Sequence, residues 1–172
     1  MDHHGSRNRR YGITSRLRLR GYDYSTPGTY FVTICTEGRA HLFGDIIDDE
    51  MVCSLAGKMV SARWTEIPSQ FPGIMVDAWV TMPNHVHALI GIGLEYPEQP
   101  HASLSDVLQW YKSITTMLYI RGVRSGGWPR VDGQLWQVGF HDHIVRDDRD
   151  LDRIRTYIEE NPARWKQDTF AP

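Results

Sequence analysis

The segment Thr81-Met82-Pro83-Asn84-His85-Val86-His87-Ala88-Leu89-Ile90 contains the pattern that decides the fold. Pro83-Asn84 is typical of a turn, because proline fixes its own φ angle and asparagine tolerates unusual backbone angles. The residues after this turn alternate with a period of two, which predicts a β-strand with two different faces. One of these faces is wholly apolar and consists of Val86, Ala88, Ile90 and Ile92.

The other face of this strand begins with His85 and His87. Residues two apart on a strand point the same way and lie about 6.7 Å apart along it. Two imidazoles can lean together across that gap and bind one metal ion. The same pattern also occurs as a pair of half-exposed strand histidines without a ligand. A third ligand and a nucleophile are therefore needed before this pair indicates a metal centre.

The chain of 172 residues has the size of a single domain with one core. No apolar run approaches the roughly 20 residues of a membrane helix, and the N-terminus lacks the apolar segment of a signal peptide. We therefore expect a cytoplasmic protein with no membrane partner. Cys35 and Cys53 are expected to be free thiols, as in a reducing compartment.

The N-terminal arm is basic although the whole chain has a net charge of −2. Six arginines lie within residues 1–20 against one aspartate, which fits either a solvated tail or a contact with a phosphate backbone. Both interpretations remain open. The candidate DNA-binding residues of the arm are Arg7, Arg9, Arg10, Arg16, Arg18 and Arg20.

The order of the predicted elements indicates an α+β fold. Strands are expected over residues 30–36, 40–47, 51–53, 74–82 and 135–145 and after Asn84, with 30–36 and 40–47 forming a hairpin. Helices are expected over 55–67, from Ser103 or Ser105 to 121, and after Asp147. These elements predict an antiparallel sheet with helices packed mainly on one face, as in ferredoxin-like and RRM-like folds, and with the histidine face open. We expect an irregular arm over 1–28, a domain over 29–166 and a tail over 167–172.

The last helix brings two further polar groups. Tyr157 and Asn161 are four residues apart, so they lie one above the other, about 6 Å apart along the axis. Pro162 is expected to push Asn161 out of the α region, which would present its amide at the helix end. A half-buried tyrosine and a C-capping asparagine are the alternative interpretation.

Residues 83–87 (PNHVH) and 157–165 (YIEENPARW) together resemble the single-tyrosine HUH transposases, most closely the REP-associated tyrosine transposases. The similarity covers roughly residues 10–166. Each further segment is weak alone, but their occurrence in this order is specific. These segments are 21–24, 28–33, 42–44, 111–113, 135–136 and 143–147.

This resemblance implies an HUH nuclease fold and a strand transferase that cuts single-stranded DNA near hairpins. His85 and His87 would hold Mg²⁺ or Mn²⁺, with Asn161 as the third protein ligand. Tyr157 would attack phosphorus and form a 5′-phosphotyrosine, leaving a free 3′-hydroxyl. His143 would support the site from nearby, whereas His141 has no counterpart and is expected at the surface.

Two other side chains are candidate DNA contacts. Lys112 is either solvated or bound to a DNA phosphate. Arg164 contacts the DNA backbone or is a cation at the C-terminal end of the helix. The resemblance leaves open whether the protein is a monomer or a homodimer.

Two other classes of function remain open. The first is a non-catalytic single-stranded nucleic-acid-binding module of the same fold, although such modules stack bases on sheet aromatics rather than histidines. The second is a zinc hydrolase or deaminase, because His-x-His occurs again at His141 and His143 and four histidines could bind zinc. That class needs a glutamate base beside the histidine or a Cys-x-x-Cys motif, and the sequence has neither.

Overall fold

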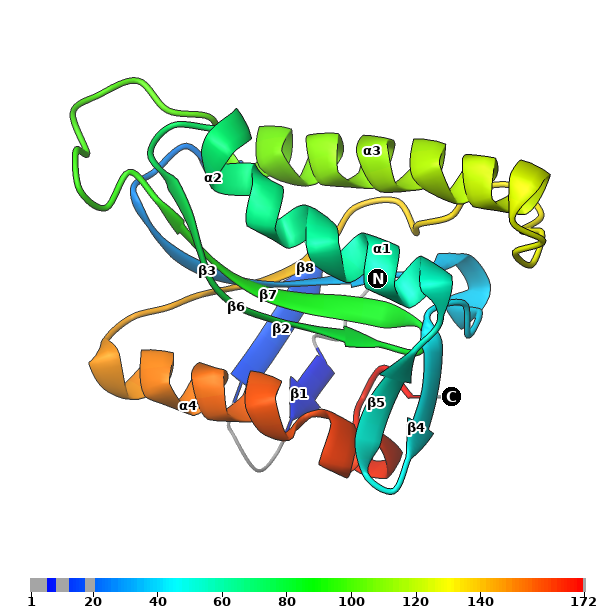
Figure 1. The fold of residues 1–172 in the computed structure, drawn as a ribbon. Coiled ribbons are helices and arrows are strands. Elements are labelled where there is room, and N and C mark those ends of the chain that lie inside the picture. The colour runs from blue at the N-terminus through cyan, green and yellow to red at the C-terminus, as the bar shows by residue number, and fades with distance from the viewer. Residues whose placement is uncertain (1–5, 9–12, 18–20, 172) are drawn as a thin grey trace.

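The computed structural model describes residues 6–8, 13–17 and 21–171, and the side chains of residues 21–171. A six-stranded antiparallel sheet forms the centre, with the strand order β1-β2-β8-β3-β7-β6 (Figure 1). Its strands are β1 (Ser6–Asn8), β2 (Ile13–Leu17), β3 (Gly28–Cys35), β6 (Ile74–Met82), β7 (His85–Ile92) and β8 (His141–Ile144).

Helices cover both faces of the sheet but mainly one (Figure 1). One face carries α1 (Leu55–Arg63), α2 (Ile67–Gln70) and α3 (Leu104–Ser125), and the other face carries α4 (Asp148–Glu160). Short 3₁₀ turns lie at η1 (Glu37–Arg39), η2 (Trp64–Glu66) and η3 (Pro162–Gln167). The predicted α+β fold is confirmed. The histidine face is not open, however, because α4 and the C-terminal segment lie against it.

The β6–β7 hairpin has the predicted bounds and the predicted faces. Met82 pairs with His85 across the Pro83-Asn84 turn. The apolar face of β7 belongs to the main core between the sheet and α1 and α3. A smaller core lies on the histidine face, and its buried members are Phe31, Leu89, Ile154, Tyr157 and Ile158. The two-residue period thus separates a packed face from the face of the candidate site.

The predicted hairpin between residues 30–36 and 40–47 is wrong. β4 (Gly44–Ile47) pairs with β5 (Glu50–Cys53) in a separate two-stranded sheet, whereas β3 pairs with β7 and β8. Asp48 and Asp49 both have positive φ angles, 49° and 62°. Two such residues form the type I′ turn that suits a two-residue hairpin, so the local turn decides the pairing.

The N-terminal arm contributes to the sheet where it is described. β1 pairs with β2, and β2 pairs with β8 through Arg16↔Asp142 and Leu17↔His141. The expectation of an arm without regular structure is wrong for these two segments. Arg7 and Arg16 lie on these strands, while Arg9, Arg10, Arg18 and Arg20 lie outside the described residues. DNA contacts by the arm remain a prediction.

Helix starts were predictable from their capping residues. The Ser103 hydroxyl accepts from the backbone N–H of Asp106, whose carboxylate accepts in return from Ser103. Asp147 caps α4 by accepting from the N–H of Asp150. Within the described residues, none of the helices has the length and apolarity that would span a membrane. Cys35 is a buried free thiol and Cys53 a half-buried one.

Candidate metal and tyrosine site

His85 and His87 meet at their Nε2 atoms, which lie 3.0 Å apart. Both side chains are fully buried. His85 Nδ1 lies 2.8 Å from Asn84 Oδ1, which accepts only, so this nitrogen donates and the Nε2 lone pair faces His87. His87 Nδ1 is 2.8 Å from Thr33 Oγ1 on the neighbouring strand. The two imidazoles are thereby fixed in orientation by groups behind them.

Tyr157 reaches the same place from α4. Its ring packs edge-on against Phe31 at 5.8 Å and lies 5.3 Å from the His87 ring, between ring centres. The start of α4 is tied to the sheet because His143 Nε2 lies 2.8 Å from Asp150 Oδ2. His143 therefore contacts the helix that carries the tyrosine, and its supporting role at the site stays a prediction.

Asn161 lies one helical turn beyond Tyr157 but differs from the prediction. Its φ and ψ of −58° and −42° are helical, so Pro162 does not push it out of the α region. The chain continues into η3, where Pro162 sits in the first turn and needs no N–H partner. Asn161 Nδ2 donates to Asp168 Oδ2 at 2.7 Å. Its Oδ1 is buried without a partner among the described residues.

Asp168 is the residue on which these groups converge, and the sequence did not single it out. Its Oδ2 accepts from the Tyr157 hydroxyl at 3.2 Å and lies 3.8 Å and 4.0 Å from the Nε2 atoms of His87 and His85. Its Oδ1 accepts from the backbone N–H of Phe170 at 2.7 Å. The phenol, the amide and the imidazoles therefore surround one carboxylate oxygen.

The protonation states of this cluster suit a cation. Burial, with His87 adding to it, holds the pKa of His85 well below its usual value, so this ring is neutral at pH 7. Burial alone would raise the pKa of Asp168. The contacts with His87 and His85 and the N–H of Phe170 outweigh burial, and its pKa lies well below the usual range. A neutral imidazole and an ionised carboxylate are the forms that bind metals.

The side chains present fit a divalent cation. His85, His87 and Asp168 offer ligand atoms within 4.8 Å of one another. Ligands at right angles and about 2.1 Å from an ion lie about 3.0 Å apart, which is the separation of the two Nε2 atoms. Asn161 presents Nδ2 to Asp168, and its Oδ1 is buried without a partner among the described residues.

Comparison with known proteins identifies the family. Residues 28–161 match the family described as "Transposase IS200 like". The chain belongs to the IS200-like transposase family. An uncharacterised protein of Haemophilus influenzae is 34% identical to this transposase over 161 residues, which cover 88% of this chain and 89% of that protein. The family match over residues 28–161 confirms the family expected from the two sequence motifs.

A solved structure shares the fold of this transposase. It is a REP-associated tyrosine transposase bound to a REP hairpin, and it superposes with a TM-score of 0.60 at 20% identity. The match covers 86% of this chain and 73% of that one.

Two other predicted residues of the transposase have side-chain contacts outside the group formed by His85, His87 and Asp168. Lys112 donates to the carbonyl oxygens of Gln137 and Gly139, and burial lowers its pKa to about 8. The expectation of a solvated Lys112 is therefore wrong, because its ammonium ties α3 to the loop before β8. Arg164 pairs with Glu160 at 2.7 Å at the end of α4. DNA contacts by either residue remain predictions.

His141 was expected at the surface, and this expectation is wrong. Its ring is half-buried and lies 5.3 Å from the ring of Phe170, and its Nδ1 is buried without a partner among the described side chains. In the register of the sheet it faces Thr33, which faces His87. His141 therefore lies in the same cross-strand row as one of the candidate ligands, whereas His143 pairs with Asp150.

Proposed function

We propose that this transposase is a metal-dependent single-stranded DNA endonuclease and strand transferase that acts near DNA hairpins. The observation that carries the proposal is the convergence on Asp168 Oδ2 of the Tyr157 hydroxyl and both histidine Nε2 atoms, at 3.2, 3.8 and 4.0 Å. A nucleophile and a pair of metal-ligating imidazoles around one point suit attack on a phosphate that lies there. The hairpin is proposed by likeness to the solved transposase, which is bound to one.

His85, His87 and Asn161 would hold Mg²⁺ or Mn²⁺, with Asp168 as an additional anionic neighbour. The cation would supply charge stabilisation at the phosphate. Tyr157 Oη would form a bond to phosphorus while the bond from phosphorus to the 3′-oxygen breaks, which gives a 5′-phosphotyrosine and a free 3′-hydroxyl. The ester keeps the energy of the cleaved bond, so a later 3′-hydroxyl can reverse the step.

The surroundings prepare the tyrosine for this role. Phe31 fixes its ring from the side, and the His143–Asp150 contact fixes the start of its helix. The candidate ligands are fully buried, so a DNA phosphate can reach them only if the C-terminal segment moves or shares the site.

The proposal is tested by looking for a covalent protein–DNA adduct. Labelled single-stranded oligonucleotides with and without a hairpin are incubated with the full chain and either Mn²⁺ or Mg²⁺, and products are separated under denaturing conditions. We expect a protein–DNA band that disappears in Tyr157→Phe. Tyr119→Phe is the matched control, because it removes a hydroxyl that bonds the Pro129 carbonyl near α3, away from the cluster.

Two results would contradict the proposal. An adduct that persists in Tyr157→Phe would assign the nucleophile elsewhere. Binding of the strand without any adduct, across strands and both metals, would favour the non-catalytic binding module.

A further inference from the structure

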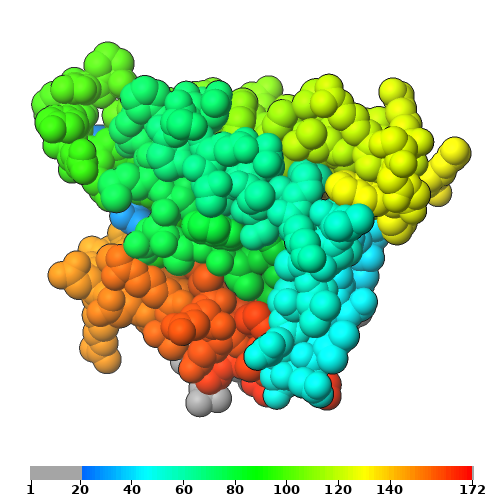
Figure 2. Space-filling view, in the orientation of Figure 1, coloured from blue at the N-terminus to red at the C-terminus, as the bar shows by residue number. Residues whose placement is uncertain are grey.

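The C-terminal end of α3 and the loop after it form a basic surface on a chain whose net charge is −2. Residues 107–131 hold four cationic side chains and no acidic one. Lys112 is turned inward to the carbonyl oxygen of Gln137, whereas the other three, Arg121, Arg124 and Arg130, are exposed. We call these three residues the arginine surface. In Figure 2 this part of the chain projects from the molecule, in yellow.

Contacts within the protein do not account for the arginine surface. None of its members pairs with a carboxylate among residues 21–171, whereas four other arginines each do so: Arg63, Arg153, Arg155 and Arg164. The helix dipole explains Arg124 alone, because only this residue lies in the last turn of α3. Cations gathered at one helix end repel one another, so an anionic partner would stabilise the arrangement.

The loop is fixed against α3, which gives Arg130 a defined place beside the helix end. The Trp128 ring lies directly over Gly122, where a Cβ atom would come within 2.2 Å of it. The same ring packs edge-on against Tyr119, with 5.4 Å between ring centres. The Tyr119 hydroxyl donates to the carbonyl oxygen of Pro129 at 2.9 Å. The cations are therefore carried on an ordered support, so a partner pays little to order it.

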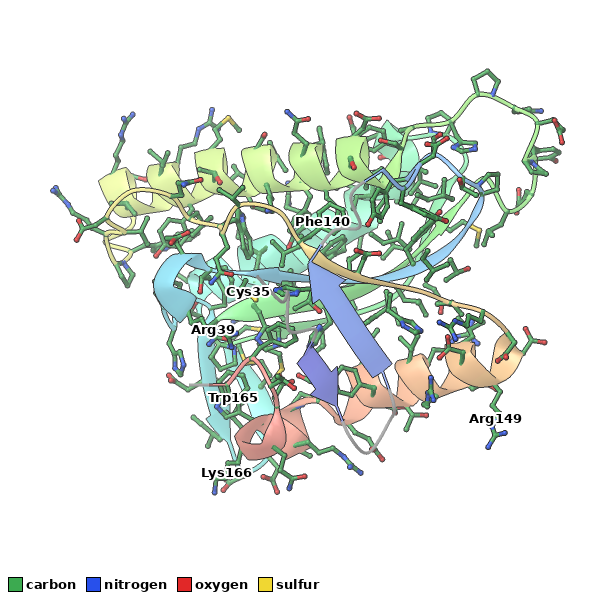
Figure 3. All side chains as sticks on the ribbon, turned by 180° about the vertical axis from the view of Figure 1, so that it is seen from behind. Cys35, Arg39, Phe140, Arg149, Trp165 and Lys166 are labelled. Carbon is green, nitrogen blue, oxygen red and sulfur yellow. The ribbon has the colours of Figure 1, made fainter. Side chains whose placement is uncertain are left out.

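The chain continues from the arginine surface to the end of the sheet at which the candidate site lies. The N–H of Gln137 donates to the carbonyl oxygen of Cys35 at 2.9 Å, and Cys35 pairs with His85 across β3 and β7. Figure 3 shows this segment running from the end of α3 past Cys35 to Phe140. Because α3 and α4 cover opposite faces, one DNA molecule can reach both the site and the arginine surface around this end of the sheet (Figure 1).

We propose that Arg121, Arg124 and Arg130 bind backbone phosphates of the base-paired hairpin stem next to the strand that is cut. This inference rests on the proposed nuclease function and adds to it a surface for duplex DNA. A duplex carries one negative charge per about 1.7 Å of its axis, so several phosphates come within reach of three supported cations. A single strand fits less well, because proteins bind it with free aromatic rings as well as cations. Trp128, the aromatic residue beside the three arginines, already packs on α3.

The experiment compares a hairpin oligonucleotide that has a single-stranded extension with the same extension alone. Every protein carries Tyr157→Phe and is kept in EDTA, so no strand is cut, and affinity is followed by fluorescence anisotropy. Three phosphate contacts contribute about 2.7 to the slope of log K against log salt. From about 50 to about 200 mM salt, the unchanged surface should therefore lose about 40-fold more hairpin affinity than a variant with all three arginines replaced by serine.

Three controls accompany this comparison. The extension alone should show the same salt dependence with both proteins. Replacing the three arginines by lysine keeps the charge that binds phosphate, so this variant should retain the slope of the unchanged surface. Lys58→Ser removes an exposed cation from α1 and should leave the slope as it is.

A serine variant with the slope of the unchanged surface would overturn the proposal. An equal loss of slope with the extension alone would overturn it as well, because the surface would then bind single strands. A lysine variant that behaves as the serine variant would show that charge is not what binds the stem. The binding assay and the adduct assay separate the two claims: an adduct with unaltered salt dependence rejects only the arginine surface, and an altered salt dependence without an adduct rejects only the nuclease.

Discussion

Replacing Asp168 tests whether one carboxylate holds the candidate site together. Asp168→Ala removes the acceptor of three hydrogen bonds, from Tyr157, Asn161 and the N–H of Phe170. Bonds to a charged group contribute about 1.5–3 kcal/mol each, but the removal of a buried anion also recovers part of its desolvation cost. With two side-chain donors left buried, we expect a loss of about 3 kcal/mol in the free energy of unfolding.

Asp168→Asn should lower the free energy of unfolding much less, because the neighbouring Asn161 amide can flip. Asn161 Oδ1 has no partner among the described residues, so a flip of this amide would let Oδ1 accept from the new amide at position 168. The single side-chain oxygen of the new asparagine could still accept from the N–H of Phe170. We expect a loss of about 1 kcal/mol, since one charge-assisted set of bonds becomes neutral.

The assay is thermal unfolding at pH 7 with EDTA, followed by circular dichroism. For a domain of this size each kcal/mol corresponds to about 2–4 °C, so Asp168→Ala should lower Tm by about 6–12 °C and Asp168→Asn by about 2–4 °C. Thr169→Ala should stay within about 0.5 kcal/mol. An asparagine variant as unstable as the alanine variant, or an alanine variant as stable as the unchanged protein, would refute the reasoning.

Three further predictions concern the elements that position the site. Asp150→Ala should cost about 3 kcal/mol, because it leaves His143 without its buried partner. Burial raises the pKa of Asp150, but the interactions with His143, the N–H of Arg146 and Arg153 together outweigh burial, so the pKa is lowered. This contribution is present above about pH 4 and fades in more acidic buffer. Urea denaturation from pH 7 to pH 3 should therefore bring the variant and the unchanged protein closer together. Gly57→Ala should destabilise by about 2 kcal/mol despite its helical position, since a Cβ there would lie 2.0 Å from the carbonyl oxygen of Phe43; a stability gain in urea would contradict this. Ser103→Ala should cost about 1 kcal/mol through the lost cap of α3, and an unchanged Tm would count against it.

The sequence predicted those parts of the fold that are decided by neighbouring residues. The alternation after Pro83-Asn84 gave the β6–β7 hairpin with its two faces, and Ser103 and Asp147 gave the helix starts. The first hairpin failed because residues 40–43 look apolar enough for a strand, yet the aspartates at 48 and 49 form the turn of a different hairpin. Turn chemistry outweighed β-propensity there.

Local sequence patterns could not predict which residues the C-terminal segment brings together. Asp168 follows the last predicted helix in a segment with neither period nor motif, and such a tail is commonly solvated. Figure 2 shows α4 and the β4–β5 hairpin in contact at the surface. The contacts of Asp168 with Tyr157, His85 and His87 place the C-terminal segment on the histidine face. An aspartate and two aromatic residues in the ten residues after Asn161, Asp168, Trp165 and Phe170, were the signal available in the sequence.

Three features of the cluster share one explanation. The His85 lone pair faces another imidazole, Asn161 Oδ1 lacks a partner among the described residues, and the Asp168 carboxylate is buried beside both histidines. A flip of the Asn161 amide does not resolve this, because its oxygen would then face the carboxylate at 2.7 Å. A divalent cation would satisfy the lone pair and the amide oxygen and balance the carboxylate at once, since nitrogen and oxygen ligands of these types are the ones that such ions bind. A cation held by these residues would also supply positive charge near the Tyr157 hydroxyl, where an ordinary phenol with a pKa near 10 needs help to ionise.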